Sequence, residues 1–134
     1  MATRSIIGIE NKNKSIDSIY CHWDGYPQNN GKILFENYNS REKVRFLINQ
    51  GWNSTLENSV LQNALSRSQK SQKDNEKEPT FDKFKDLAAF LKHGDSVAQF
   101  MYLYTDDEGW IYWESGAYYP KRNRLSDFFK VWTK

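Results

Sequence analysis

The sequence predicts an α+β domain with about four antiparallel strands in two hairpins and helices packed on one face of the sheet. Two observations indicate this class. Short runs rich in β-branched and aromatic residues lie near both ends of the chain, and amphipathic helical patterns lie between them. A length of 134 residues fits one domain, 1–134, and an aromatic content of 16% favours a packed core.

The first hairpin is predicted from residues 5–10 and 16–23, two strand-like runs that are joined by a polar turn. Asp24 and Gly25 then interrupt the second strand. An aspartate accepts backbone hydrogen bonds in a turn, and a glycine adopts a positive φ without strain. We therefore expect a tight turn at this point.

Helical patterns follow the first hairpin. Residues 33–38 predict a short helix, and Asn39 is expected to cap a second helix that ends at Gly51. A third amphipathic segment spans residues 56–65. Residues 66–79 contain no apolar side chain, so we expect a flexible polar loop there.

The last part of the chain predicts a helix, the second hairpin and a final helix. Thr80 is expected to cap a helix that ends at Gly94. Residues 97–104 and 110–115 form the clearest hairpin pattern of the chain. After Pro120, four apolar residues recur at helical spacing: Leu125, Phe128, Phe129 and Trp132.

Alternation along the second hairpin separates two kinds of side chain. Phe100, Tyr102 and Tyr104 share one face, and Met101 and Leu103 share the other, so both faces are expected to be at least partly covered. If helices cover only one face, the tyrosine-rich face is a candidate interface for a partner or ligand. A homodimer through this face is the simplest case.

Charge and cysteine usage narrow the class of protein. The 19 basic and 17 acidic residues give a net charge of +2, far from the strong basicity of a general nucleic-acid binder. Cys21 is the sole cysteine, so no intrachain disulfide can form. Neither an apolar leader nor a run of about 20 apolar residues is visible. We expect a cytoplasmic protein without a membrane span.

The stretch YCHWDGYP, residues 20–27, concentrates candidate site residues at the end of a predicted strand. Strand alternation sends Cys21 and Trp23 to one face and Tyr20 and His22 to the other. Cys21 then has apolar neighbours, so it is predicted to be a buried, unreactive thiol. The candidate ligand-binding residues are Tyr20, His22, Asp24 and Tyr26.

His22 and Asp24 are also the candidate catalytic pair. On one face of a strand, the carboxylate could orient the imidazole for acid–base chemistry. The alternative is a structural hydrogen bond at the strand end. The sequence contains no Cys-x-x-Cys pair and no Gly-rich nucleotide loop, so no metal and no cofactor are predicted.

The same stretch carries a family resemblance. YCHWDGYP, preceded by TRSIIGIEN and followed by GKILFENY, resembles a family of small uncharacterised proteins of bacteriophages and prophages. The resemblance covers about the first half of the chain. It implies a phage-type accessory protein, and it assigns no activity to any residue.

A second candidate site interleaves rings with cations after the second hairpin. Its residues are Tyr118, Tyr119, Lys121, Arg122 and Arg124. Such a composition stacks bases and holds phosphates in nucleic-acid-binding proteins. The alternative is a solvated turn that leads into the last helix.

Three functions fit these patterns. The leading hypothesis is a non-enzymatic binding module for a host or phage macromolecule or for a small metabolite. The second is a small hydrolase or nucleotide-processing enzyme that uses His22 and Asp24. The third is a nucleic-acid-binding module that uses residues 118–124.

Overall fold

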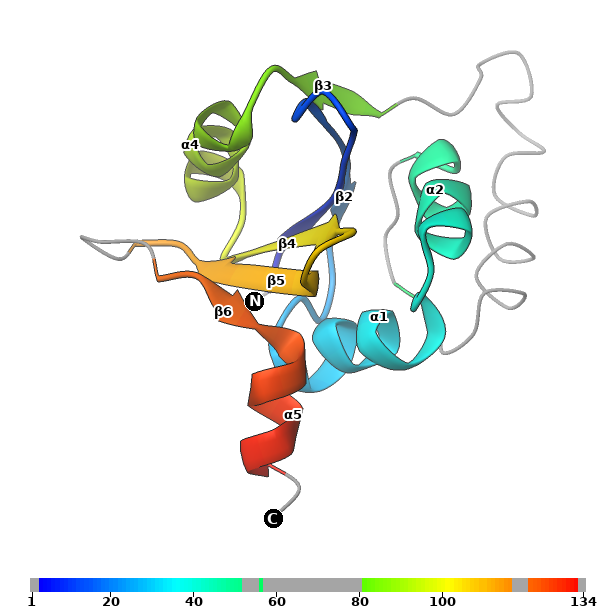
Figure 1. Cartoon of the computed structure of the whole chain (residues 1–134). Coiled ribbons are helices and arrows are strands. Elements are labelled where there is room, and N and C mark those ends of the chain that lie inside the picture. The colour runs from blue at the N-terminus through cyan, green and yellow to red at the C-terminus, as the bar shows by residue number, and fades with distance from the viewer. Residues whose placement is uncertain (1–2, 52–55, 57–80, 117–120, 133–134) are drawn as a thin grey trace, which may run out of the picture.

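A computed structural model describes residues 3–51, 56, 81–116 and 121–132 (Figure 1). The strands are β1 (Ser5–Glu10), β2 (Ile16–Cys21), β3 (Asp82–Phe84), β4 (Phe100–Thr105), β5 (Gly109–Glu114) and β6 (Asn123–Arg124). The helices are α1 (Lys32–Asn37), α2 (Arg41–Asn49), α4 (Leu87–Val97) and α5 (Leu125–Trp132), and a π-helical turn, η1 (Pro27–Gly31), precedes α1. The described chain is therefore α+β, as predicted.

The described strands form one sheet in the order β3-β2-β1-β4-β5-β6. Both predicted hairpins are confirmed, because β1 pairs with β2 and β4 pairs with β5 in antiparallel register. The expectation of a purely antiparallel sheet is wrong. The central strands β1 and β4 are parallel, with Ser5 opposite Phe100 and Ile9 opposite Tyr104. Parallel strands need cover on both faces, and residues 5–9 of β1 are all buried.

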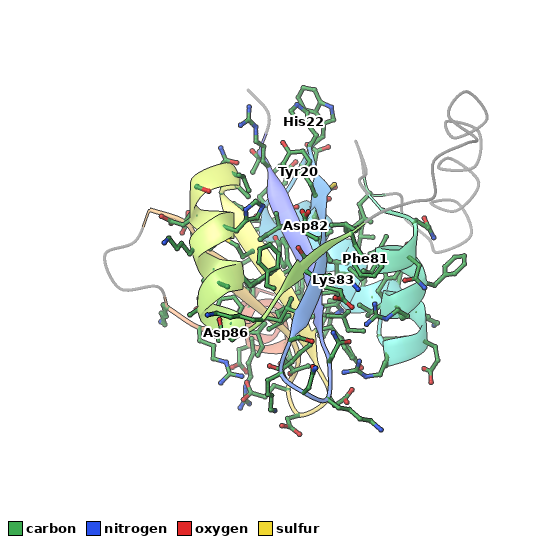
Figure 2. The ribbon with its side chains drawn as sticks, turned by 90° about the horizontal axis from the view of Figure 1, so that it is seen from above. Tyr20, His22, Phe81, Asp82, Lys83 and Asp86 are labelled. Atoms are coloured by element: carbon green, nitrogen blue, oxygen red, sulfur yellow. The ribbon has the colours of Figure 1, made fainter. Side chains whose placement is uncertain are left out.

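Helices cover both faces of the sheet, which corrects the prediction that they pack on one face (Figure 1). Helix α4 lies on one side, where Ile6 and Met101 form a core cluster with Phe90. Helices α1, α2 and α5 supply the core of the other side, around Ile7 and Tyr102. Figure 2, seen from above, places α4 and α2 on opposite sides of the strands.

The tyrosine-rich face of the second hairpin lies within the larger core cluster. Tyr102 is fully buried there, and Tyr104 and Tyr112 are partly buried against the same cluster. This face is covered by helices, so it is not the exposed interface for a homodimer that the alternation suggested. Both faces of the hairpin are covered, as the pattern predicted.

The observed helix boundaries differ from the predicted ones at two N-caps and at the end of α4, which runs to Val97 rather than ending at Gly94. Helix α2 begins after Ser40, whose hydroxyl accepts a hydrogen bond from the Lys43 backbone N–H at 3.4 Å, rather than after Asn39. Helix α4 is capped by Asp86, whose carboxylate accepts from the Ala89 N–H at 2.9 Å. Residues 82–84, predicted to be helical, form the short edge strand β3. None of the described helices has the length and apolar character to cross a membrane.

Several predicted features lie outside the described residues. They are the amphipathic segment at 57–65, the polar loop at 66–79 and the cap Thr80. The predicted C-terminal helix is confirmed as α5, and its buried residues Leu125 and Phe129 belong to the larger core cluster.

Candidate functional site

The buried side-chain amide of Asn30 holds the segment that follows β2 in place. Asn30 is completely buried, and its side-chain nitrogen lies 3.3 Å from the Ser5 hydroxyl, 3.4 Å from the Cys21 sulfur and 3.3 Å from the Trp23 carbonyl oxygen. A buried amide with these partners holds both ends of the turn in one arrangement. The sequence after Cys21 is therefore a rigid corner of the core.

Gly25 lies at the point where this corner touches the rest of the fold. Its N–H donates to the Thr3 carbonyl at 2.8 Å, and its own carbonyl accepts from the Tyr102 hydroxyl at 2.6 Å. A Cβ on Gly25 would lie 2.8 Å from the Thr3 oxygen and 2.9 Å from the Arg4 carbonyl carbon, so only glycine fits. Burial raises the pKa of Tyr102 well above its ordinary value, which keeps this hydroxyl protonated as a donor.

Asp24, and not Gly25, carries the positive φ of the turn. Its φ is 57°, a left-handed conformation that aspartate tolerates better than most residues. The Asp24 carbonyl accepts from the Asn30 N–H at 3.2 Å and from the Asn29 side chain at 3.3 Å. The sequence-based assignment of the positive φ to Gly25 is wrong, because close approach to Thr3 and Arg4 explains that glycine.

Above this corner lies a set of exposed and half-buried rings, which we call the aromatic platform: Tyr20, His22, Trp23 and Tyr26. Trp23 is 46% exposed and Tyr26 is 38% exposed, although both are large apolar side chains. The His22 and Trp23 rings meet edge to face with centroids 4.8 Å apart. Figure 2 shows Tyr20 at the end of β2 and His22 beyond it, outside the body of the sheet and helices.

The structure divides the predicted site residues into two pairs. The Tyr20 hydroxyl lies 2.8 Å from Nδ1 of His22, and the Tyr26 hydroxyl lies 3.5 Å from the Asp24 carboxylate. A neutral His22 that carries its proton on Nε2 would accept from Tyr20. Within the described part of the chain, no hydrogen bond or ion pair joins His22 to Asp24. The catalytic pair proposed from the sequence is therefore not assembled.

Strand alternation predicted most of this arrangement correctly. Cys21 is buried in the larger core cluster, while Tyr20 and His22 leave the opposite face of β2. Trp23 is the exception, because β2 ends at Cys21 and the turn at Asp24 directs the chain away from the core. Sequence reasoning thus missed Trp23 as a surface residue, and no local signal in the sequence marks this change of direction.

Cys21 is a core thiol rather than a nucleophile. Burial raises its pKa from 9.0 to about 11, although hydrogen bonds with Asn30 and with nearby backbone groups oppose the shift. The group is therefore a protonated thiol at neutral pH, and a thiol is a much weaker nucleophile than a thiolate. The buried, unreactive cysteine predicted from the sequence fits this environment.

The Cys21 thiol should make the free energy of unfolding fall at alkaline pH. The folded-state pKa of about 11 exceeds the unfolded value of 9.0, so the unfolded state loses its proton first as the pH rises. We expect the wild type to lose about 2 kcal/mol more than Cys21→Ser between about pH 8 and 10.5. Urea unfolding followed by tryptophan fluorescence at each pH measures the difference. Parallel pH profiles for the two proteins would contradict this assignment.

The structure gathers three of the predicted nucleic-acid-binding residues around one cavity. Lys121, Arg122 and Arg124 line it, and its volume is about 560 Å³. Tyr118 and Tyr119 lie outside the described residues. The cavity also contains Glu108, which sequence reasoning missed because it belongs to the hairpin turn between β4 and β5.

No group of three or more His, Cys, Asp or Glu side chains in the described ranges is placed to hold a metal ion. Comparison with protein-family models, with curated proteins and with solved structures gave no match. The fold and the site together define an α+β protein whose described strands form a mixed six-stranded sheet and which presents aromatic side chains on a rigid corner.

Proposed function

We propose that this protein is a non-enzymatic binding module that recognises a protein partner through the aromatic platform. The observation that carries the proposal is Trp23, which is 46% exposed on a corner that buried hydrogen bonds hold in place. Tryptophan and tyrosine dominate the energetic centres of protein interfaces. A preformed corner also reduces the entropy that is lost on binding.

The geometry supports binding more strongly than catalysis. His22 is paired with Tyr20 and packs against Trp23. Asp24 stabilises the turn through its positive φ and through the hydrogen bonds that its carbonyl accepts. The cavity of about 560 Å³ includes none of the platform residues. An exposed ring that lies outside this cavity suits the surface of a macromolecule better than a small substrate, which needs to be enclosed.

The resemblance to phage proteins suggests what kind of partner is involved. A small phage-type accessory protein would act on a host or phage protein in the host cytoplasm, where Cys21 would remain reduced.

Removal of the Trp23 ring tests the proposal. We expect Trp23→Ala to weaken the affinity for the protein partner about 30-fold or more, as truncation of an interface tryptophan commonly does. The tagged wild-type protein is first used to capture partners from bacterial lysate. The affinity of the purified partner is then measured by calorimetry for each variant.

Phe46→Ala is the matched control, because Phe46 on α2 is 48% exposed and is not part of the platform. It should leave both the captured partner and its affinity unchanged. Equal affinity of the wild type and Trp23→Ala for every captured protein would refute the proposal. Thermal unfolding of both variants would show that the corner remains folded.

A further inference from the structure

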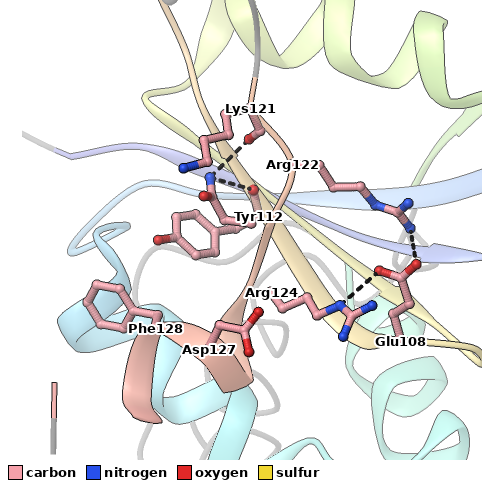
Figure 3. Close-up of a pocket in the computed structure, with 8 residues that line it drawn as sticks. Glu108, Tyr112, Lys121, Arg122, Arg124, Asp127 and Phe128 are labelled. Carbon is pink, nitrogen blue, oxygen red and sulfur yellow. Dashed lines mark hydrogen bonds and ion pairs between the residues drawn. The ribbon is translucent and has the colours of Figure 1, made fainter. Parts of the chain in front are cut away.

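The cavity beside β6 has the composition of a ligand site. Strand β6 and helix α5 border it, and Figure 3 shows the side chains that line it. Its volume of about 560 Å³ lies within the range of roughly 300–1,000 Å³ that small-molecule sites occupy. No residue of the aromatic platform contributes to it, so an inference drawn from it is independent of the proposed function.

One carboxylate holds two guanidinium groups at the edge of this cavity. Arg122 Nη2 lies 3.0 Å from Glu108 Oε1, and Arg124 Nε lies 3.4 Å from Glu108 Oε2. The arginine side chains remain 52% and 54% exposed, whereas that of Glu108 is 24% exposed. Each guanidinium has five N–H donors, so both retain donors for a second anion.

The charge of the lining favours an anionic ligand. Lys121, Arg122 and Arg124 supply three positive charges, and Glu108 and Asp127 supply two negative ones. The sum is +1 before a ligand binds. A ligand phosphate near both arginines could take the place that the Glu108 carboxylate now occupies, because phosphate carries more charge and more acceptor oxygens.

Aromatic rings form the opposite part of the lining. The Tyr112 and Phe128 rings stand at 90° with centroids 6.1 Å apart. Figure 3 shows these rings at one end of the cavity and the Glu108 ion pairs at the other, with Arg124 between them. Such a layout suits a ligand with a flat ring at one end and an anion at the other.

We propose that this cavity binds a nucleotide, with the phosphate on Arg122 and Arg124 and the base against Tyr112 and Phe128. Glu108 is the internal competitor: it holds the two arginines in place when no ligand is bound, and it is displaced when the phosphate arrives. The same chemistry is available from a free mononucleotide or from a nucleotide within a single strand.

Two substitutions in one ion-pair cluster should change affinity in opposite directions. Glu108→Gln removes the competing charge and should raise nucleotide affinity about five- to tenfold. Arg122→Gln removes a phosphate contact and should lower affinity by about tenfold. Lys92→Gln on α4 is the control, since this exposed lysine lies on a helix that covers the other face of the sheet. It should have no effect.

The titrations use the full chain at low salt with four probes: adenosine monophosphate, a short thymidine oligonucleotide, inorganic phosphate and polyglutamate. Tighter binding of the mononucleotide identifies a free nucleotide as the ligand. Tighter binding of the oligonucleotide, with affinity that falls steeply with salt, identifies a single strand. Either result supports the proposal when Glu108→Gln strengthens binding.

Three results would overturn the proposal. The first is an unchanged or weakened nucleotide affinity in Glu108→Gln while thermal unfolding shows an intact fold. The second is inorganic phosphate or polyglutamate binding as tightly as either nucleotide probe, because the rings would then contribute nothing. The third is no binding of either nucleotide probe by the wild type and by Glu108→Gln at millimolar concentration.

Discussion

Replacement of Asn30 by aspartate is expected to lower the free energy of unfolding by about 4 kcal/mol at neutral pH, because it leaves an uncompensated charge in the core. The Asn30 amide nitrogen faces the Trp23 carbonyl oxygen at 3.3 Å, so an introduced carboxylate would place a negative charge against an acceptor. The residue is completely buried, so water cannot relieve this repulsion. Urea unfolding at constant salt measures the loss.

The pH dependence of this variant gives a second signature. Burial should raise the pKa of the introduced carboxyl above its unfolded value, so the folded state binds the extra proton more strongly. The stability deficit relative to the wild type should therefore shrink as the pH falls from about 7 to 4.5. Gln28→Glu introduces a charge at an exposed position of the same turn and should cost much less. A deficit independent of pH would contradict a buried carboxylate.

Gly25→Ala is expected to cost about 3 kcal/mol, through steric overlap together with loss of hydrogen bonding at the corner. The new Cβ would lie 2.8–2.9 Å from atoms of Thr3, Arg4 and Ser5, two of which belong to the backbone and cannot swing aside. The shift that relieves this contact also disturbs the 2.6 Å hydrogen bond from Tyr102. Chemical denaturation measures the cost.

Gly116→Ala is the control that separates the steric cost at Gly25 from the general cost of replacing a glycine. Gly116 has a φ of 81°, and a Cβ added there would meet no atom within 4 Å, so alanine carries only the backbone penalty of about 1 kcal/mol. If Gly25→Ala costs no more than Gly116→Ala, the close approach to residues 3–5 does not limit the fold. Loss of partner binding in Gly25→Ala alone would further connect the corner with the platform.

The sequence predicted the local features of this fold better than its long-range ones. Alternation located both hairpins and the opposite faces of Cys21 and His22, because those properties depend on neighbouring residues. The parallel pairing of β1 with β4 could not be predicted in this way, since partners such as Ser5 and Phe100 are far apart in the chain. The sign of this parallel pairing in the sequence is that β1 is apolar on both faces.

The candidate sites show the same limit. The stretch 20–27 was identified correctly as a corner, yet the partner of His22 is Tyr20 rather than Asp24, because Asp24 adopts a positive φ. Asn30 looks like an ordinary polar loop residue until the fold buries it beneath Trp23. The cations Lys121, Arg122 and Arg124 were identified from composition, whereas Glu108 required the hairpin register.

The parallel contact between β1 and β4 also determines when the chain can fold during synthesis. The first hairpin leaves the ribosome before β4, but an isolated two-stranded hairpin is at best marginally stable. The edge of β1 that faces β4 finds its partner only when residues 100–105 have been made. The pairing of β1 with β4 then closes a long loop that contains all the residues between the two strands. Such a high contact order favours slow folding. Nascent chains that stop before β4 would therefore expose Ile6 and Ile7 and become substrates for chaperones and proteases.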